Sequence, residues 1–583
     1  MAFNILFCIC WLQLSWLTVA AFNIGGPVNT TTGIIRGKPS PLRSSVSMYL
    51  GIKYAKAPKG ALRFAAPVPV HRSPGVSNTT SFSPQVPRIN DCPCNRVPAN
   101  KAHMLGPVGE KIAKSLSQEN HFLDEDCLAL NIWTKPQQGE RKKAVIFYIH
   151  GGAFWLGSGS ITATDGSVLA DENDVVVVSF NYRLSIFGFS GAPGQPWNVG
   201  LMDQRLALEW TKANIAGFGG DPSRITVIGQ SVGGISADML AFSYPRDPIA
   251  HAFIAMSGVA SSYFSAAMQG KYPQKTWYQV SADLGCGGRE AGEATVSCMR
   301  SKSQDALLNA IKPLGIQSPI VPFWPVPDGN LVPKNYETDG NAGRFARVPF
   351  LAGSAEWEMG LFFVIPLMYM NLTEDQVAAL PVGLIRPLDD LITLIAFTCP
   401  TAESIGFRRK YQLPVWRYRN YGGDYNNTKL GPAGSCWHAS DVFVLFGTAS
   451  FVTGVEDSEF EAKAAAYMRD AWTTFAKDPY NGLNTRLHWP QYDPLTKSMI
   501  QLSYKQQTEA SYTFNWKVDA FCPVIAVFKD IYLVILRILS FLIKSQNAPG
   551  LMDNLTDILY HSLSNEEALK TALESLQSIA HSL

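Results

Sequence analysis

The sequence predicts an α/β fold in which a central, mostly parallel sheet is flanked by helices. Short apolar runs rich in β-branched or aromatic residues occur at positions 144–150, 175–180, 225–229 and 251–258. Such nearly continuous apolar strands are typical of a sheet that is covered on both faces. Between the second and third runs, residues 200–218 carry apolar side chains at helical spacing, which predicts one broad buried face. Strands alternating with helices in this order indicate the α/β class.

The rest of the chain extends this sheet. Apolar runs at residues 348–354 and 414–420 predict two further strands, and residues 370–412 between them predict a mostly helical insertion. The chain has 583 residues, of which 46% are hydrophobic and 16% are charged, so it can bury a large core. We interpret residues 21–524 as one large domain built on a single sheet.

The charge balance excludes some classes of partner. Lys and Arg total 49 and Asp and Glu total 47, which gives a formal net charge of +2. No long-range field therefore favours nucleic acid or an anionic membrane, and a neutral small molecule fits better. No Cys/His or His/carboxylate group has the spacing of metal ligands, so we expect neither a metal nor another cofactor.

The N-terminus predicts export. Residues 1–20 are nearly all apolar and end at small residues, Ala20 and Ala21, as a cleaved secretory signal does. No Lys or Arg precedes the apolar run, which leaves a buried first helix or a membrane anchor as alternatives. Without Cys8 and Cys10, eight of the 10 cysteines remain, an even number suited to disulfides in a secreted protein. Glycosylation sequons occur at Asn29, Asn78, Asn371, Asn426 and Asn554.

Residues 525–583 predict a C-terminal helical extension. The run 531–543 is strongly apolar, but Arg537 interrupts it, so it falls short of a membrane span and packing on the domain is the alternative to membrane contact. Ser564 and Glu567 form a capping-box pattern before an amphipathic segment that ends at Leu583. This apolar face could seek a partner, including another copy of the chain.

The motif Gly229-Gln230-Ser231-Val232-Gly233 follows the run 225–229 and precedes a helix-forming stretch, the setting of a nucleophile elbow. A tight turn there would expose the hydroxyl of Ser231 at the N-terminus of the next helix. A second motif, His150-Gly151-Gly152-Ala153-Phe154, closes the first apolar run and predicts an oxyanion loop. The predicted donors are the N–H groups of Gly152, Ala153 and Val232.

Five segments, one of which contains the Ser231 motif, make the chain resemble the type-B carboxylesterase/lipase family, which includes carboxylesterases and cholinesterases. The segments are YLGIKYAKAPKGALRF (49–64), EDCLALNIW (125–133), NYRLSIFGF (181–189), GFGGDPSRITVIGQSVGG (217–234) and WPVPDG (324–329). The likeness extends from about Gly33 to Cys522, and FTCP, PVWRYRN and AWTTFAKDPYNGL are most similar to the fungal branch. The resemblance implies an α/β-hydrolase fold and makes residues 21–524 a catalytic domain.

The resemblance also implies the remaining catalytic residues. Glu358 occupies the acid position in Gly353-Ser354-Ala355-Glu356-Trp357-Glu358, with Glu356 as its rival, and His438 occupies the base position before Phe446-Gly447. The chain order Ser, Glu, His agrees with α/β hydrolases. His438 would take the proton of Ser231, Glu358 would orient the imidazole, and water would then hydrolyse the acyl-enzyme.

Two departures from the family point to uncharged or apolar esters. Many members have Glu-Ser-Ala at the elbow, whereas this chain has Gln230-Ser231-Val232 and so lacks a carboxylate beside the nucleophile. The loop that ends at Cys127 contains no Trp to bind a quaternary ammonium group, which argues against a cholinesterase. Candidate walls of the substrate pocket are the aromatic residues Phe154, Trp155, Phe323, Trp324 and Phe362, each of which could equally be an ordinary core residue.

Disulfide pairs are likewise implied by the resemblance. Cys127 is expected to pair with Cys92 or Cys94, Cys286 with Cys298, and Cys399 with either Cys436 or Cys522. Three alternatives to a simple esterase stay open. They are a lipase, if residues 92–127 form a mobile apolar lid, a biosynthetic enzyme that transfers its acyl group to an alcohol, and a non-catalytic adhesion protein. The last is disfavoured because the three catalytic side chains are present.

Overall fold

The computed structural model describes residues 23–88, 105–117, 122–136, 142–262, 272–317, 323–362, 389–422, 425–431 and 434–523. The predicted signal at residues 1–20 and the predicted extension at residues 525–583 lie outside the described residues, as do Cys92, Cys94, Asn371 and Asn554. Within the described part, no helix has both the length and the apolarity needed to cross a membrane. The sequons at Asn29, Asn78 and Asn426 are exposed.

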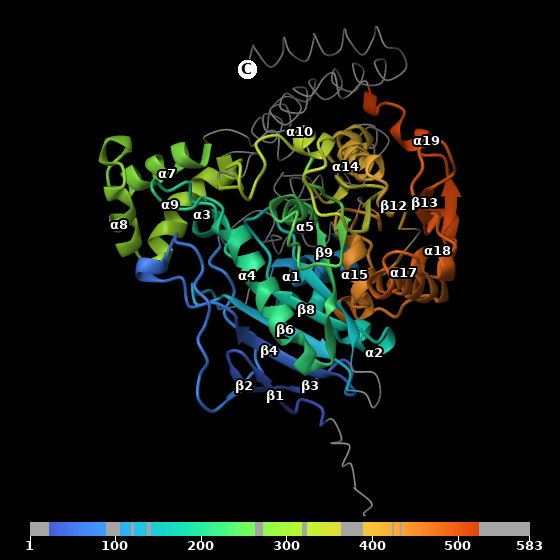
Figure 1. The fold of residues 1–583 in the computed structure, drawn as a ribbon, viewed down its shortest axis with the longest axis horizontal. Helices are drawn as coiled ribbons and strands as arrows, with labels where there is room; N and C mark the ends of the chain where they lie inside the picture. The colour runs from blue at the N-terminus through green and yellow to red at the C-terminus, as the bar shows by residue number, and fades with distance from the viewer. Residues whose placement is uncertain are drawn as a thin grey trace, which may run out of the picture.

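A long mixed sheet forms the centre of the molecule (Figure 1). Its described strands lie in the order β14-β13-β12-β11-β10-β9-β7-β8-β6-β4-β3. They are β3 (Lys38–Pro39), β4 (Ser47–Lys53), β6 (Ala129–Thr134), β7 (Lys143–Ile149), β8 (Val176–Phe180), β9 (Gly220–Gln230), β10 (Ala252–Met256), β11 (Phe350–Ala355), β12 (Val415–Asn420), β13 (Met499–Leu502) and β14 (Ser511–Thr513). The strands from β8 to β13 pair in parallel, and the outer strands are antiparallel. This is the predicted architecture.

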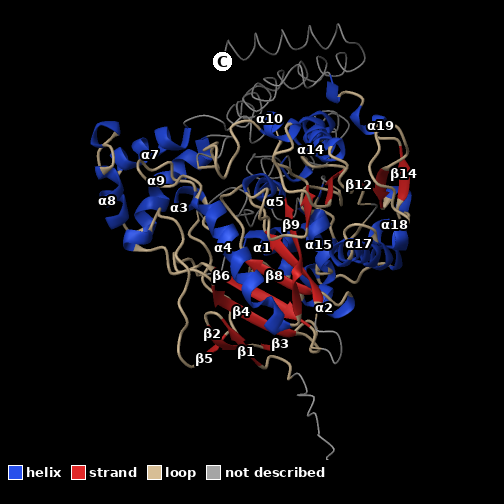
Figure 2. Cartoon of the chain, in the orientation of Figure 1, coloured by secondary structure: helices blue, strands red, loops and turns tan. Residues whose placement is uncertain are grey.

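Helices cover both faces of the sheet (Figure 2). The described α-helices are α1 (Gly106–Ser117), α2 (Ser167–Glu172), α3 (Ser185–Gly188), α4 (Val199–Asn214), α5 (Val232–Ser243), α7 (Tyr272–Asp283), α8 (Ala294–Ser301), α9 (Gln304–Gln317), α10 (Tyr336–Asn341), α14 (Cys399–Lys410), α15 (Ser440–Phe446), α16 (Ala449–Thr453), α17 (Glu459–Lys477), α18 (Gly482–Leu487) and α19 (Trp516–Asp519). Short 3-10 segments are η1 (Gly60–Leu62), η3 (Thr162–Thr164), η4 (Ile215–Phe218), η5 (Arg289–Ala291) and η8 (Tyr504–Gln506), and η6 (Leu394–Thr398) is a π-helix.

Strand β7 shows why the central strands are apolar on both faces of the sheet. Side chains alternate between the faces of a strand, and Phe147 belongs to a core cluster with α4 and α5, whereas Ile146 and Tyr148 belong to a second cluster with α15 and α17. Every residue of β7 is buried. A run of apolar residues without polar alternation is therefore what this position requires, as the sequence predicted.

Some elements differ from the sequence-based expectation. The helix predicted over residues 200–218 ends at Asn214 and tightens into η4, which Gly219 terminates with φ of +83°. A separate sheet of β1 (Pro27–Thr30), β2 (Gly33–Arg36) and β5 (Val76–Asn78) was not predicted, because each strand is only three or four residues long. The described part of the insertion at residues 370–412 is helical, as predicted.

The cysteines are arranged partly as predicted. Disulfides join Cys286 to Cys298 and Cys399 to Cys522, so the structure selects Cys522 from the two partners left open for Cys399. Cys436 is a buried free thiol that donates to the carbonyl oxygen of Asn420. The predicted pairing of Cys127 with Cys92 or Cys94 is wrong. Cys127 is a free thiol whose side chain lies in the main core cluster, and burial raises its pKa, so it stays protonated.

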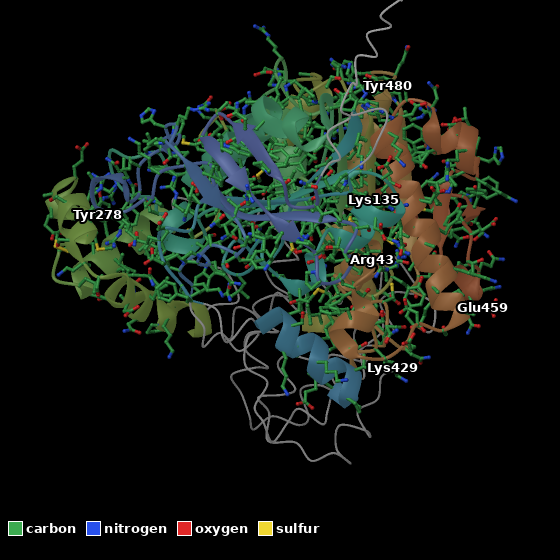
Figure 3. All side chains as sticks on the ribbon, turned by 90° about the horizontal axis from the view of Figure 1, so that it is seen from below. Arg43, Lys135, Tyr278, Lys429, Glu459 and Tyr480 are labelled. Carbon is green, nitrogen blue, oxygen red and sulfur yellow. A yellow bond between two sulfur atoms is a disulfide. The ribbon has the colours of Figure 1, made fainter. Side chains whose placement is uncertain are left out.

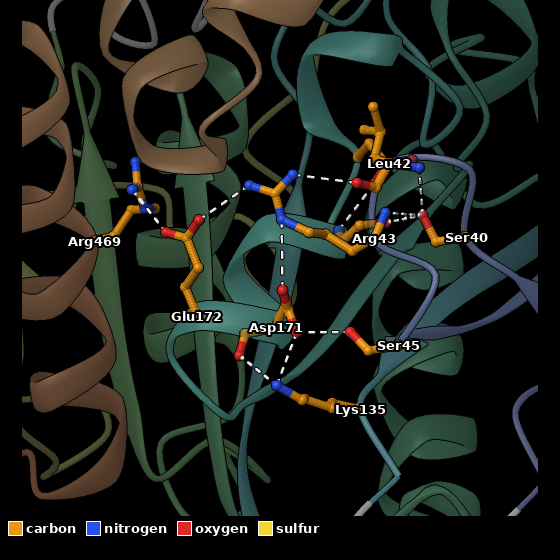
Figure 4. Close-up of polar contacts among 10 residues, drawn as sticks. Ser40, Leu42, Arg43, Ser45, Lys135, Asp171, Glu172 and Arg469 are labelled. Atoms are coloured by element: carbon orange, nitrogen blue, oxygen red, sulfur yellow. Dashed lines mark hydrogen bonds and ion pairs between the residues drawn. The ribbon is translucent and has the colours of Figure 1, made fainter. Parts of the chain in front are cut away.

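A network of charged side chains ties α2 to its surroundings (Figure 4). Arg43, between β3 and β4, contacts both Asp171 and Glu172, while Lys135 after β6 contacts Asp171. Arg469 of α17 also binds Glu172.

Seen from below in Figure 3, Tyr278 of α7 and Glu459 of α17 lie on opposite sides of the molecule. The network thus joins α2 to α17 on one flank of the sheet, away from helices α7, α8 and α9.

Candidate active site

The candidate site lies at the carboxyl ends of neighbouring parallel strands. Ile149 at the end of β7 pairs with Gly229, and Gln230 at the end of β9 pairs with Met256. Met256 in turn pairs with Gly353 of β11. Residues that follow these strand ends therefore share one edge of the sheet, which is where ligands bind in open α/β folds.

Ser231 stands on a strained turn between β9 and α5. Its φ of +60° and ψ of −128° are unusual for a residue with a side chain, and its N–H donates to the carbonyl oxygen of Met256 at 2.8 Å. Ser231 is partly exposed although the residues around it are buried. The turn therefore presents the hydroxyl to the site at the N-terminus of α5.

The flanking glycines are required by close backbone contacts. A Cβ at Gly229 would lie 2.0 Å from the carbonyl oxygen of Gly233, and a Cβ at Gly233 would lie 2.1 Å from that of Ile149. Both distances are far below van der Waals contact. The G-x-S-x-G pattern is thus explained by the approach of β7, β9 and α5 around the serine.

The glycine loop after β7 lies directly on this turn. A Cβ at Gly151 would be 3.1 Å from the Cβ of Ser231, and Gly152 and Ala153 have φ of +111° and +55°. Within the described residues, the N–H groups of Gly152 and Ala153 make no hydrogen bond, and Val232 is the first residue of α5 and so has no intrahelical acceptor. The three predicted oxyanion donors thus have no hydrogen-bond acceptor within the described residues.

The structure brings His438 and Glu358 together. The Nδ1 atom of His438 lies 2.5 Å from Oε2 of Glu358, and the other oxygen, Oε1, accepts the N–H of Ala355 at 2.7 Å. Glu358 is fully buried and His438 is 4% exposed. An ionised carboxylate is an acceptor only, so Nδ1 carries the proton and Nε2 is the ring atom that can accept one, here facing the side-chain amide of Gln230 at 3.3 Å.

Backbone contacts hold the two loops that carry this pair. Trp357 donates its N–H to the carbonyl oxygen of Cys436 at 3.1 Å, and Trp357 and Trp437 form an isolated parallel bridge. The rival acid, Glu356, lies two positions earlier and is partly exposed, and its N–H donates to the carbonyl oxygen of Asn420. The chain has left β11 at this point, so strand alternation no longer relates Glu356 to Glu358.

His150 is unsuited to act as a base. Its ring stacks on Tyr182 with centroids 4.4 Å apart, and its Nδ1 lies 2.8 Å from the carbonyl oxygen of Gly151. Burial, with a smaller effect of the nearby Arg88 charge, lowers the pKa of His150 to about 4. His150 is therefore neutral at neutral pH and supports the glycine loop.

Two phenylalanine rings pack against the His438 ring. Phe362, a predicted pocket residue, has its ring centroid 5.3 Å from that of His438, and Phe397 lies at 5.2 Å. The sequence did not point to Phe397. It lies on the π-helix η6, and such segments are frequent at functional sites, but nothing in the sequence of this segment indicates its contact with His438.

The other predicted pocket aromatics are packed in the main core cluster. These residues are Phe154, Trp155, Phe323 and Trp324. Phe154 is fully buried, and its ring contacts that of Trp324 edge to face at 5.0 Å. The contacts around Phe154 are thus those of core packing, whereas Phe362 adjoins the histidine.

A second buried carboxyl lies close to the His438 and Glu358 pair. Asp441 of α15 is fully buried, and neither carboxyl oxygen has a hydrogen-bond partner among the described residues. Burial, and next the charge of Glu358, raises the pKa of Asp441 to about 7. Asp441 was not among the predicted site residues, although an acidic residue at the start of the apolar run DVFVLF, one turn after His438, is an identifiable signal.

We expect Asp441→Asn to change the pH dependence of stability. A raised carboxyl pKa favours the protonated form in the folded state, so the contribution of Asp441 is fully present below the ordinary aspartate pKa of 3.8 and is lost as the pH rises toward 7. The Asn side chain does not ionise, so its contribution to stability is not lost as the pH rises. Relative to wild type, the variant should therefore gain about 3 kcal/mol in free energy of unfolding between pH 5 and pH 8. Urea unfolding of wild type and Asp441→Asn at pH 5 and pH 8 measures these free energies. The prediction is contradicted if the two proteins differ in free energy of unfolding by the same amount at both pH values.

No group of three or more His, Cys, Asp or Glu side chains within the described residues has an arrangement suited to a metal ion. Among the described residues, the strand ends carry a hydroxyl on a strained elbow, three backbone N–H groups that make no hydrogen bond, and a buried imidazole–carboxylate pair. These are the components that nucleophilic attack on a carbonyl carbon requires.

Comparison with known proteins identifies the family. The family model described as "Carboxylesterase family" matches residues 26–379 and 367–520. Chlorogenic acid esterase of Aspergillus niger is 31% identical over 467 residues, which are 78% of this chain and 83% of that protein. Carboxylesterase 1E of Mus musculus is 29% identical over 550 residues, covering 83% of this chain and 92% of that protein. A structure of PNB esterase matches with a TM-score of 0.65 and 25% identity, covering 84% of this chain and 97% of that one. The chain therefore belongs to the carboxylesterase family, has the α/β-hydrolase fold and is a type-B carboxylesterase.

Proposed function

We propose that this protein is a secreted carboxylic ester hydrolase that acts on uncharged or apolar esters through a Ser231-His438-Glu358 triad. The observation that carries the proposal is the buried His438–Glu358 pair, 2.5 Å apart, at the same sheet edge as the elbow of Ser231. Family membership supports the reaction class, and the geometry supports the assignment of roles.

The proposed mechanism begins with attack of Ser231 Oγ on the ester carbonyl carbon. His438 Nε2 takes the hydroxyl proton and then donates it to the oxygen of the departing alcohol, leaving an acyl group on Ser231. Glu358 holds the Nδ1 proton and offsets the positive charge of the imidazolium. A water molecule then repeats the two proton transfers and releases the acid.

The N–H groups of Gly152, Ala153 and Val232 are proposed to stabilise the negative oxygen of the tetrahedral intermediate. Their backbone positions are fixed by the left-handed turn of the glycine loop and by the start of α5. Fixed donors need no reorganisation when charge develops, and one such donor contributes about 3 kcal/mol to the transition state.

The proposed preference for uncharged or apolar esters rests on the groups around His438. Gln230 places a neutral amide where many family members have a carboxylate, and Phe362 and Phe397 add two aromatic rings. The lipase alternative requires residues 92–127 to form a mobile lid. Helix α1 in this segment buries Ile112 fully in a cluster with residues of η3 and α16, which favours an esterase.

Secretion is proposed from the apolar segment at residues 1–20. The two disulfides and the exposed sequons at Asn29, Asn78 and Asn426 support it, because stable disulfides and N-glycans are typical of the secretory pathway. N-terminal sequencing of the protein collected from culture medium tests the cleavage site expected near Ala20.

Hydrolysis of a series of esters tests the proposed activity. We expect turnover of p-nitrophenyl acetate and butyrate, with a fall for palmitate, and we would include chlorogenic acid because of the name of the Aspergillus niger relative. Added methanol or glycerol, with product analysis, separates hydrolysis from acyl transfer. If the folded protein turns over none of these esters, the proposal fails.

Phe397→Ala tests the aromatic contact with the base. The ring of Phe397 limits the positions open to the imidazole, and displacement of a catalytic group by about 1 Å can cost up to 100-fold in rate. We expect kcat to fall about tenfold, with a smaller change in KM. Phe451→Ala removes an exposed ring on α16 and is the control. An unchanged kcat in Phe397→Ala would show that the His438 ring is held in place without the contact to Phe397.

A further inference from the structure

The side chain of Gln230 occupies the nitrogen of His438 that the proposed mechanism needs. Its Nε2 atom lies 3.3 Å from Nε2 of His438, and both residues are buried. On the other side, its Oε1 atom would be 3.0 Å from a Cβ at Gly151, so the amide spans from the glycine loop to the imidazole. The two residues are 208 positions apart in the sequence.

The hydroxyl of Ser231 makes no hydrogen bond to this nitrogen in the described part of the structure. Within the described residues, the hydroxyl of Ser231 forms no hydrogen bond, whereas Nε2 of His438 contacts the Gln230 amide. Nδ1 of His438 donates to Glu358, so Nε2 of the neutral ring can only accept, and the NH2 group of Gln230 is the matching donor. Gln230 thus faces the lone pair that the proposed mechanism assigns to the Ser231 hydroxyl.

An amide also fits the protonated ring. After the imidazole takes the Ser231 proton, Nε2–H becomes a donor and needs an acceptor, which the carbonyl oxygen Oε1 of the same amide supplies when the group turns over. A carboxylate at this position could only accept, and would favour the charged ring in every state. An apolar side chain could do neither.

We propose that Gln230 is a positioning residue for the catalytic base: its amide holds His438 aligned in the resting enzyme and accepts from it after proton transfer, without an added charge. The inference rests on the proposed function of Ser231 and His438. Gln230 acts through His438 and does not take part in bond making.

Among the described residues, four other side chains contact the imidazole or act on its charge. Glu358 faces it from the loop after β11, and Asp441, on α15, interacts with its charge. Phe362 and Phe397 pack against the ring and carry no charge. Replacing Gln230 by Glu would therefore introduce one new negative charge at Nε2. The existing negative charge, that of Glu358, lies at Nδ1 on the other side of the ring.

Two variants, Gln230→Glu and Gln230→Met, test the proposal in the full chain. The pH profile of kcat/KM for p-nitrophenyl butyrate is measured for each and for wild type. We expect the acid limb of Gln230→Glu to move up by about one pH unit, because a carboxylate beside the ring favours its protonated, inactive form. The activity of this variant at pH 6 should fall about tenfold relative to wild type, and its activity above pH 8 should be close to wild type.

Gln230→Met keeps the length of the side chain but removes both the donor and the acceptor. We expect kcat to fall about three- to tenfold at every pH, with KM little changed and no upward shift of the acid limb. A side chain that only fills space would give the opposite pattern, with Gln230→Met close to wild type. This variant also tests the proposal if Gln230→Glu does not fold.

A second readout does not depend on turnover. In Ser231→Ala, the downfield proton resonance of His438 Nδ1–H is followed against pH, with and without Gln230→Glu. The pH at which this resonance changes is expected to move up by the same amount as the acid limb of kcat/KM. A folded Gln230→Glu variant in which neither the resonance nor the acid limb moves overturns the proposal. If wild type hydrolyses no ester but the resonance shifts, the proposed function fails while the contact between Gln230 and His438 stands.

Discussion

Ser231→Ala is expected to lower kcat for ester hydrolysis about 10⁶-fold, because no acyl-enzyme can form without the hydroxyl. The fold should be retained, since Ala removes one oxygen that makes no hydrogen bond within the described residues. A residual rate above the uncatalysed reaction is expected from the oxyanion donors and from substrate binding.

The measurement is steady-state hydrolysis of p-nitrophenyl butyrate, with enzyme prepared separately from wild type to avoid carry-over. Ser257→Ala is a suitable control, because Ser257 follows the neighbouring strand β10 and has a positive φ like Ser231, but is fully buried. Activity of Ser231→Ala within tenfold of wild type would remove Ser231 from the mechanism.

Glu358→Gln is expected to lower kcat about 10⁴-fold, the second largest effect. The amide keeps the shape of the side chain, but it can present an NH2 group to Nδ1, which stabilises the wrong tautomer of His438 and removes the charge that offsets the imidazolium. Glu358 is fully buried, so no solvent molecule replaces the lost carboxylate contact directly.

Glu356→Gln is the matched control, because Glu356 is the other acid in the same motif. It is partly exposed, and the carboxylate that contacts His438 belongs to Glu358. We expect kcat of this variant to stay within about threefold of wild type. A large loss in Glu356→Gln with little loss in Glu358→Gln would reverse the assignment of the acid.

The predictable parts of the site are those that depend on local sequence. Ser231 could be assigned because a strand, a glycine-flanked serine and a helix follow one another directly, and the contacts at Gly229 and Gly233 are the physical reason for that pattern. The sheet was predictable because a strand buried on both faces, such as β7, must be apolar at every position.

Glu358 and His438 required more than local sequence. Strand alternation could not separate Glu358 from Glu356, since the chain leaves β11 at Ala355 and turns before the acid. The bridge between Trp357 and Trp437, which brings the two loops together, has no signal in either segment alone. Only the resemblance to the family supplied both residues.

The remaining features depend on contacts between distant segments. Phe397 comes from the helical insertion and reaches His438 through the placement of η6. The contact of Gln230 with His438 joins residues 208 positions apart, so the sequence indicated the missing charge at Gln230 but not the partner of its amide. The free thiol of Cys127 shows the same limit, because the packing of its side chain in the core decides its state.

The most direct test of the central claim is covalent labelling of the nucleophile. Wild-type protein and Ser231→Ala are treated with diethyl p-nitrophenyl phosphate, digested and analysed by mass spectrometry. The account predicts one diethylphosphoryl group per wild-type chain, on the peptide that contains Ser231, parallel loss of esterase activity, and no label in the variant. A label on another residue, or esterase activity that survives complete labelling of Ser231, would contradict it.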